Sequence, residues 1–282
     1  MSVNLAEVFK KEIISADSRQ IYKELKIGTA KPSQEELARV KHHFVNCKSI
    51  HDYYSSGRFE VEALELISNL NENNEIFVVG GSGLYIKALC EGIDEMPPPD
   101  FLLRANINEK LNKYGLEVLQ NELKRLDQET WEMIDIKNPN RVIRALEVIH
   151  QTGKKFSEIK KGKSKTRNFE LLKIGLDLPR DELFNRINHR CDLMLEQGLL
   201  EEVKSLSDVQ HLSALQTVGY KEFFGYFDNK YDLEEAIRLF KRNSRRYAKR
   251  QITWFKGDSA ISWYQPHQHE EIRVSIDQFL SQ

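Results

Sequence analysis

The sequence predicts an α/β fold, in which a parallel-sheet core is interrupted by a mostly helical insertion. Short apolar runs at 12–15, 76–79 and 171–178 are the strand candidates, and the first two lead through polar or glycine-rich turns toward helical patterns. From residue 101 to about 165, amphipathic helical repeats replace any strand pattern. The proline run at 96–100 marks the change. The expected parts are a first core segment at 1–99, an insertion at 100–164 and a second core segment at 165–282.

The first core segment alternates helices with short strands. Ser33 followed by Glu36 is a capping-box pattern, which places a helix start at Ser33. Apolar side chains at helical spacing define the other helices, and β-branched runs define the strands. The expected elements are, in order, a helix at 2–10, a strand at 12–15, a helix at 33–40, a strand from 42, a helix at 59–70, a buried strand at 76–79, a glycine turn at 80–83 and a helix at 84–90.

The remaining elements are mainly helical. Apolar positions recur every three to four residues through most of the insertion and the C-terminal part. The run 171–178 restores strand character after the insertion. The helices are expected at 102–114, 116–126, 129–134, 141–150, 180–197, 199–206, 233–250 and 272–280.

Composition limits the compartment and the partners. The formal net charge is −1, but cations concentrate at 154–167 and 241–250, as expected of a protein that docks on phosphates with one face. No apolar run is long enough to cross a membrane, so no membrane partner is expected. The three cysteines form no Cys-x-x-Cys pair, which indicates a reducing cytoplasm and no structural zinc. His42 and His43 point to opposite sides of a strand, so no metal site is expected from them.

A cluster of polar residues follows the first strand. Asp17 lies at its centre, with Ser18, Arg19 and Gln20 directly after it. Ligands in open α/β sheets bind beyond the carboxyl ends of the strands. Asp17 taken alone is more typical of a turn or a helix N-cap than of a catalytic base. The long polar run, continued by Gly28-Thr-Ala-Lys-Pro32, favours a functional site.

A glycine-rich turn, Gly80-Gly-Ser-Gly83, follows the strand candidate at 76–79. It places the Ser82 hydroxyl near a helix N-terminus, which favours anions. Glycines also allow close approach of another backbone. The turn is not a dinucleotide fingerprint, because Tyr85 or Ile86 stands where a third glycine is required.

Basic residues are arranged on two predicted helices. Arg141 and Arg144 are three apart and share a face, although pairing with Glu147 on a solvated helix would also explain them. Further along, Arg242, Arg246 and Arg250 recur at four-residue spacing. Like charges so placed repel each other, and a nucleic-acid or diphosphate ligand would offset that repulsion.

Together these segments resemble the tRNA dimethylallyltransferases, also called isopentenyl-tRNA transferases, of the IPP transferase family. The resemblance covers nearly the whole chain, from the first helix to Trp263. It implies a P-loop NTPase-like core of the nucleotide-binding, ATP-binding type. The implied reaction transfers a dimethylallyl group from dimethylallyl diphosphate to N6 of the adenosine 3′-adjacent to the tRNA anticodon. The implied partners are the tRNA anticodon stem-loop and dimethylallyl diphosphate, with Mg²⁺ as cofactor and a monomeric enzyme.

The resemblance also implies roles for single residues. Asp17 would accept the amine proton, Ser82 would orient the site, and Arg190 would clamp the diphosphate. The helical insertion and the basic helix would grip the RNA from two sides. The residues implied in tRNA binding are Asp17, Ser18, Arg19, Gln20, Ser82, Arg104, Asn140, Arg141, Val142, Ile143, Arg144, Gln216, Thr217, Val218, Gly219, Tyr220, Lys221, Arg242, Arg246, Lys249 and Arg250.

The sequence departs from the family pattern at its start. No Gly-x-x-x-x-Gly-Lys-[Ser/Thr] motif occurs, and residues 2–9 resemble the helix that follows such a loop. The expectation is a chain that lacks the first strand and loop, binds tRNA, turns over poorly and has an unpaired strand edge.

Two alternatives remain at this point. An adenylate isopentenyltransferase would prenylate a free nucleotide, but it would need neither the insertion nor the basic surfaces. A non-catalytic RNA-binding relative stays open because of the absent loop.

Overall fold

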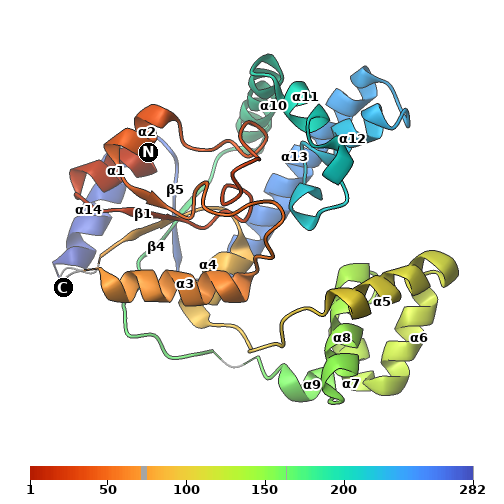
Figure 1. Cartoon of the computed structure of the whole chain (residues 1–282). Helices are drawn as coiled ribbons and strands as arrows, with labels where there is room; N and C mark the ends of the chain where they lie inside the picture. The colour runs from red at the N-terminus through yellow and green to blue at the C-terminus, as the bar shows by residue number, and fades with distance from the viewer. Residues whose placement is uncertain (71–74, 163, 282) are drawn as a thin grey trace. The chain divides into compact units, whose positions relative to one another are not determined.

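The computed structural model describes residues 1–70, 75–162 and 164–281. It divides into two compact units (Figure 1). The first, here the α/β unit, joins Met1–Cys90 with Arg167–Gln282, and the second, the helical unit, is Glu91–Thr166. The helical unit therefore begins before the predicted boundary at residue 100.

The strands of the α/β unit pair in parallel, as the sequence predicts. One sheet has the order β2-β1-β3, with β1 (Ile13–Ser15) between β2 (His42–His43) and β3 (Phe77–Val79). Ile13 is in register with His42 on one side and with Phe77 on the other. A second sheet pairs β4 (Lys173–Leu176) with β5 (Ile261–Tyr264), also in parallel. The described strands thus form two sheets, and β5 was not predicted.

Strand β3 is less buried than the sequence predicted. Its middle residue, Val78, is 37% exposed, and Phe77 and Val79 are only half-buried. Within the described residues β3 has a single ladder partner, β1, so it lies at an edge of its sheet. A run of β-branched residues indicates a strand but does not show whether both faces are covered.

The helices of the α/β unit lie mostly where they were predicted. The capping box of α2 is formed, since Ser33 Oγ accepts from Glu36 N and the Glu36 carboxylate accepts from Ser33 N. Helix α12 was not predicted, and its aromatic residues and Gly225 have weak helix propensity. The helices are α1 (Ser2–Val8), α2 (Gln34–Arg39), α3 (Ser56–Asn69), α4 (Gly83–Glu91), α10 (Arg180–Glu196), α11 (Leu199–Lys204), α12 (Lys221–Phe227), α13 (Leu233–Phe255) and α14 (His269–Leu280).

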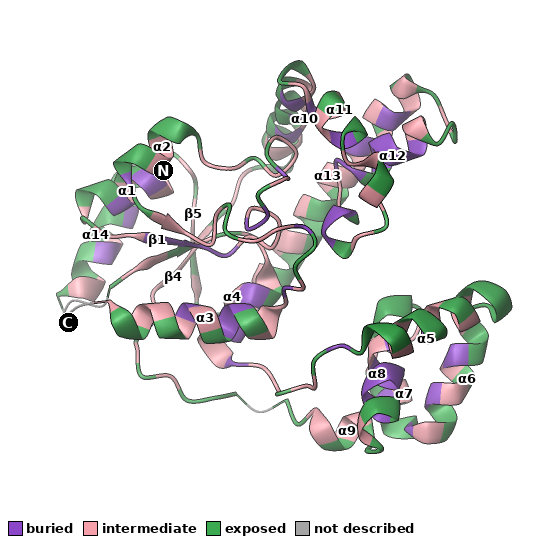
Figure 2. Ribbon diagram, in the orientation of Figure 1, coloured by how far each residue is buried: buried purple, intermediate pink, exposed green. Residues whose placement is uncertain are grey.

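The main hydrophobic core anchors the turn after β1. Ala16 and Ile21, on either side of the polar cluster, are both fully buried. They pack in one cluster with Phe59 of α3 and Phe223 of α12. Both helices carry buried stretches, drawn in purple in Figure 2. Burial of each fully enclosed aliphatic side chain contributes on the order of 1.5–3 kcal/mol. The polar residues between the two anchors are therefore held by the core.

The helical unit contains no strand among its described residues, as predicted. Its helices surround a core in which Leu119, Leu123, Val142 and Leu146 are fully buried. The elements are α5 (Phe101–Tyr114), α6 (Leu116–Leu126), α7 (Gln128–Met133), α8 (Pro139–Thr152) and the unpredicted α9 (Phe156–Ile159).

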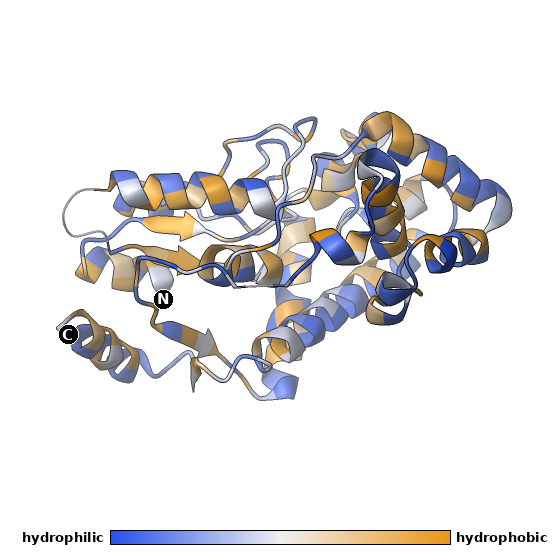
Figure 3. Ribbon diagram, turned by 90° about the horizontal axis from the view of Figure 1, so that it is seen from below, coloured by the Kyte–Doolittle hydropathy of each residue, from blue (hydrophilic) through white to orange (hydrophobic). Residues whose placement is uncertain are grey.

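The helices of both units are amphipathic. Apolar and polar residues alternate around them, so each ribbon shows both colours (Figure 3). Among the described residues, no helix combines the length and the apolar character that crossing a bilayer requires.

Candidate functional site

Asp17 uses its two carboxylate oxygens differently. Oδ1 accepts hydrogen bonds from the backbone nitrogens of Arg19 at 2.8 Å and Gln20 at 3.3 Å. This is the geometry of a turn-capping aspartate. No hydrogen bond from a described residue reaches Oδ2, which is left to accept a proton. The structural and the chemical interpretations of Asp17 are therefore compatible, one for each oxygen.

Ser82 lies beside the Asp17 turn. Its amide donates to Ala16 O at 3.1 Å, and its hydroxyl oxygen accepts from Ser18 N at 2.9 Å. The Oγ atoms of Ser82 and Ser18 are 3.1 Å apart. A Cβ atom on Gly80 would overlap the backbone of Ala16, so only glycine permits this approach. The structure thus brings the two polar motifs together at the ends of β1 and β3.

Gln20 braces the segment 28–32 against this turn. Its Nε2 donates to Thr29 O at 3.3 Å and Ala30 O at 3.1 Å, while its Oε1 accepts from Ser15 Oγ at 3.1 Å. In the same segment Lys31 Nζ donates to Tyr22 O, and burial lowers the pKa of this lysine to about 8. Residues 28–32 are therefore held against the turn that contains Asp17.

Glu202 of α11 secures the base of that segment, a role that sequence reasoning missed. Its carboxylate accepts from the backbone nitrogens of Lys26, Ile27 and Gly28 at 3.0, 2.9 and 3.2 Å. It also accepts from the Tyr220 hydroxyl at 2.6 Å. The only signal was its place in an acidic stretch, which does not distinguish it from its neighbours.

Residues 216–221 make mainly internal contacts. Tyr220 is fully buried, which contradicts the prediction that its side chain contacts RNA, and its ring packs against Gly28. Gly219, at φ +93°, donates to the buried Glu222, which also accepts from Asn243 of α13 at 2.7 Å. Gln216 Nε2 donates to Gln210 O at 2.6 Å. On the surface of this segment, Gln216 and Lys221 are exposed and Thr217 and Val218 are half-buried.

Helix α13 brings cations up to the glycine turn. Gln251 Nε2 donates to Gly81 O at 2.9 Å, and the Trp254 ring lies where a Cβ atom of Gly83 would stand. Of the four cations predicted to bind RNA, Arg242 is half-buried with Nε 3.3 Å from Asn243 Oδ1. The other three are exposed and form no ion pair with a described residue, namely Arg246, Lys249 and Arg250.

Arg190, the predicted diphosphate clamp, is exposed on α10. Asp192, its most obvious acidic neighbour, pairs with Lys241 at 2.5 Å instead. No hydrogen bond or ion pair of the described residues joins Arg190 to Asp17 or Ser82. The charge of Arg190 is therefore available to a ligand.

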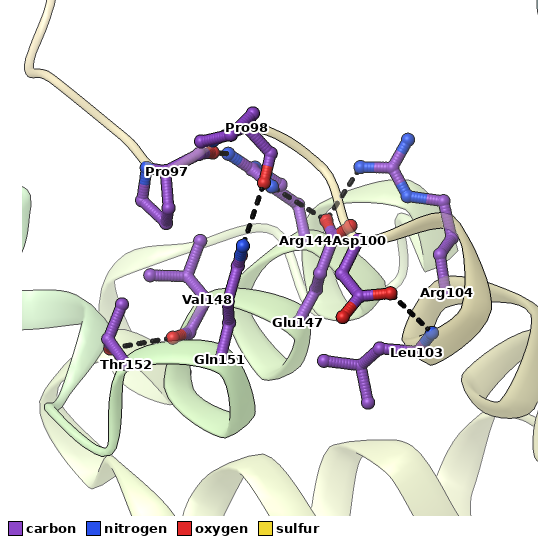
Figure 4. A network of polar contacts seen from close by, with 10 residues as sticks. All are labelled: Pro97, Pro98, Asp100, Leu103, Arg104, Arg144, Glu147, Val148, Gln151 and Thr152. Atoms are coloured by element: carbon purple, nitrogen blue, oxygen red, sulfur yellow. Dashed lines mark hydrogen bonds and ion pairs between the residues drawn. The ribbon is translucent and has the colours of Figure 1, made fainter.

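The predicted RNA-contacting residues of the helical unit fall into two groups. Val142 and Ile143 are buried in its core, which contradicts side-chain contact with RNA. Arg104 and Arg144 are only partly exposed, and both bond to Glu147 (Figure 4). The sequence had suggested such pairing for Arg144 as an alternative to RNA contact. Outside these groups, Asn140 and Arg141 are exposed.

The described residues contain no group of three or more His, Cys, Asp or Glu arranged to hold a metal ion. The adjacent histidines have separate partners, as their alternation predicts. His42 Nδ1 is 2.7 Å from Val40 O, and His43 Nε2 is 2.5 Å from Glu12 Oε2. The three cysteines are free.

Comparison with known proteins gives concordant matches. The model of the family described as IPP transferase matches residues 20–258. A tRNA dimethylallyltransferase of Cytophaga hutchinsonii is 49% identical over 278 residues, which are 98% of this chain and 91% of that protein. A tRNA dimethylallyltransferase 1 of Bacteroides thetaiotaomicron is 46% identical over 96% of this chain and 89% of its own length.

Solved structures match over the same extent. The full-length tRNA isopentenylpyrophosphate transferase of Bacillus halodurans superposes with a TM-score of 0.70 at 37% identity, covering 99% of this chain and 90% of that one. A eukaryotic dimethylallyltransferase acting on tRNA gives a TM-score of 0.74 at 28% identity, covering 99% of this chain and 73% of that one. The fold is therefore the P-loop NTPase-like α/β fold of these transferases.

Proposed function

Because the chain belongs to the IPP transferase family, we propose that it transfers a dimethylallyl group from dimethylallyl diphosphate to N6 of the adenosine 3′-adjacent to the anticodon in tRNA. The observation that supports this most strongly is the position of Ser82 against the Asp17 turn, where two parallel strands end, since its hydroxyl accepts from the backbone of Ser18 next to Asp17. Relatives that are named tRNA dimethylallyltransferases share nearly the whole length of the chain.

Asp17 is the proposed base. The adenine N6 amine attacks C1 of dimethylallyl diphosphate, the new C–N bond forms, and the C–O bond to diphosphate breaks. The diphosphate leaves with the bonding electron pair, and Oδ2 of Asp17 takes the amine proton. Oδ1 keeps the turn in place through Arg19 N and Gln20 N. The carboxylate is thus fixed before the substrate arrives, so little entropy is lost in orienting its lone pair toward the amine.

Ser82 is proposed to orient the amine. Its hydroxyl is already fixed by Ser18 N and by Ser18 Oγ, so it presents a defined direction beside Asp17. The adenine must leave its stack to reach the end of a sheet, which makes base extrusion part of the proposal. Trp254 is 49% exposed beside the glycine turn and offers a face on which an extruded base can stack.

The departing diphosphate needs positive charge. Arg190, with no ion-pair partner among the described residues, and the exposed cations of α13 are the groups proposed to supply it. Mg²⁺ is proposed to enter with the diphosphate, where it would neutralise phosphate oxygens. The described residues hold no cluster of side chains for an all-protein cage, so the metal would be shared with the substrate phosphates, and the Ser18 hydroxyl would be its protein ligand.

The tRNA-facing surface is proposed to include exposed cations of both units. In the α/β unit these are Arg246, Lys249 and Arg250, and in the helical unit Arg141 with the exposed part of the Arg104–Arg144 pair. Cations near a phosphate backbone release bound counterions and so raise affinity at low salt. The free thiols fit a reducing compartment, and we place the protein in the cytoplasm as a monomer.

The test offers the chain two acceptors, an anticodon stem-loop and free AMP, with labelled dimethylallyl diphosphate and Mg²⁺. Transfer to the stem-loop alone is expected, because the helical unit and α13 serve only an acceptor with a phosphate backbone. The transfer is expected to be slow, because the sequence has no Gly-x-x-x-x-Gly-Lys-[Ser/Thr] motif to cradle the diphosphate. Transfer to AMP alone would identify an adenylate isopentenyltransferase instead. Tight binding of the stem-loop with no transfer to either acceptor would identify a non-catalytic RNA-binding relative.

A further inference from the structure

Glu147 of α8 holds two arginines through one carboxylate oxygen. Its side chain is fully buried, and Oε2 accepts from Arg104 Nη2 at 2.6 Å and from Arg144 Nη1 at 2.7 Å. Arg144 also donates from Nη2 to Pro97 O at 2.6 Å. Figure 4 shows the two guanidiniums approaching the carboxylate from α5 and from α8 itself. One buried anion therefore fixes two cations from two helices.

Stability alone does not account for this arrangement. Glu147 Oε1 and Arg104 Nε are buried and have no hydrogen-bond partner among the described residues. Well-packed apolar residues in place of a buried ionic cluster are often as stable or more stable. A cluster that is present despite its unsatisfied atoms indicates instead that the two guanidiniums must be held in position.

The cluster has spare donors and spare charge. Two guanidiniums against one carboxylate give a net charge of about +1. The side chains of Arg104 and Arg144 are 32% and 26% exposed. The second terminal nitrogen of Arg104 is turned away from Glu147 (Figure 4), and no described residue bonds to it. Donors that face outward in a fixed fork suit the oxygen atoms of a phosphate.

The neighbouring residues extend the same surface. Asn140 and Arg141 are exposed in the first turn of α8. They precede Arg144 by four and three positions, so the three side chains share one face of the helix. The buried face of α8 carries Val142 and Leu146, which fixes the helix and thus the direction of its polar face.

We propose that Glu147 is a positioning residue that holds Arg104 and Arg144 as a preformed pair for one backbone phosphate of bound RNA. This inference rests on the proposed function, since it takes tRNA as the ligand. Fixing two long side chains before binding removes most of their ordering cost from the binding step. Glu147 acts through the arginines and does not touch the RNA.

The test is the affinity for a labelled anticodon stem-loop, measured by fluorescence anisotropy over a range of salt concentrations. Glu147→Gln is expected to weaken binding about tenfold, which corresponds to ~1.4 kcal/mol. The slope of log affinity against log salt concentration is expected to decrease by the equivalent of about one phosphate contact, and the same decrease is expected for Arg104→Gln. The double variant Arg104→Gln/Glu147→Gln is expected to lose less affinity than the sum of the two single losses, because Glu147 then acts through Arg144 alone.

Glu122→Gln is the matched control. Glu122 is 14% exposed in the same unit and also pairs with two cationic side chains, Lys110 at 2.5 Å and His150 at 2.9 Å. It should leave the affinity and salt slope unchanged. If Glu147→Gln does not fold, by far-UV circular dichroism, Arg104→Lys replaces it. A lysine keeps the charge but cannot bond Glu147 and present a fixed second donor, so the same tenfold loss is expected.

Several outcomes overturn the inference. The first is that folded Glu147→Gln binds the stem-loop as tightly as wild type or more tightly. The second is that the affinity losses of the two single variants add fully in the double variant. The third, where Arg104→Lys is needed, is that this variant binds with wild-type affinity. Failure of the wild-type chain to bind the stem-loop would instead refute the proposed function, and with it the ligand assumed here. Equal binding by wild type and Glu147→Gln refutes the positioning role alone.

Discussion

At the scale of the residue, side chains of the candidate site fix backbone groups as well as being proposed to contact a ligand. Asp17 and Glu202 accept two and three backbone N–H groups, respectively. Gln20 joins the loops that these carboxylates hold. The sequence predicted which residues gather around Asp17, because they are contiguous. It could not predict Glu202, which is separated from the three backbone groups that it holds by more than 170 positions.

Lys31 makes a pH dependence testable at this scale. Its pKa is lowered to about 8 in the folded chain, mainly by burial, from the ordinary 10.5. Between these values the unfolded chain binds more protons, so the free energy of unfolding should rise with pH. Urea titrations from pH 7.5 to 10 should therefore show wild type gaining stability relative to Lys31→Met, with exposed Lys26→Met as background. A flat or falling difference would contradict the burial of this amine.

At the scale of the element, local signals were predictable and long-range burial was not. The capping box of α2 needs only Ser33 and Glu36, so it could be recognised in the sequence and is formed. Helix α12 exists because Phe223 and Phe224 are buried against the core, and its residues have weak helix propensity. Val142 and Ile143 stand within a basic motif, yet the helical periodicity directs them inward.

The start of the second core segment depends on a buried ion pair. Arg167 Nη2 donates to Glu60 Oε1 of α3 at 2.8 Å and to Ala88 O of α4 at 2.6 Å, with side chains 11% and 4% exposed in the pair. Arg167→Met should cost about 3–5 kcal/mol in urea unfolding, because it leaves the buried carboxylate without this guanidinium.

The control for this prediction is Arg273→Met on α14. Arg273 is 44% exposed and pairs with Glu270 and Asp277 at the surface. Its loss should change the free energy of unfolding far less than the loss of Arg167, because its ion pairs are exposed to solvent. A cost for Arg167→Met as small as that for Arg273→Met would show that Arg167 does not anchor this segment.

At the scale of the whole molecule, charge is segregated on a nearly neutral chain. The net charge is −1, yet α13 presents exposed cations and the helical unit presents a second basic surface on α8. The cluster at 241–250 predicted the α13 surface, and the shared face of Arg141 and Arg144 predicted the α8 surface. The other predicted cluster, at 154–167, includes Arg167, which is buried in an ion pair. Each unit has its own core, so each can present its basic residues on a rigid support.

The role of Asp17 as the base is best tested by single-turnover transfer to an anticodon stem-loop, comparing wild type with Asp17→Asn. The affinity for the stem-loop is measured in parallel. Asparagine keeps an oxygen that can accept from Arg19 N and Gln20 N, so the turn should persist, but it cannot take the amine proton. The transfer rate of Asp17→Asn is expected to be about 10²–10⁴-fold below that of wild type, while its stem-loop affinity stays within about twofold of wild type. Transfer by Asp17→Asn at the wild-type rate would contradict the assignment of Asp17 as the base.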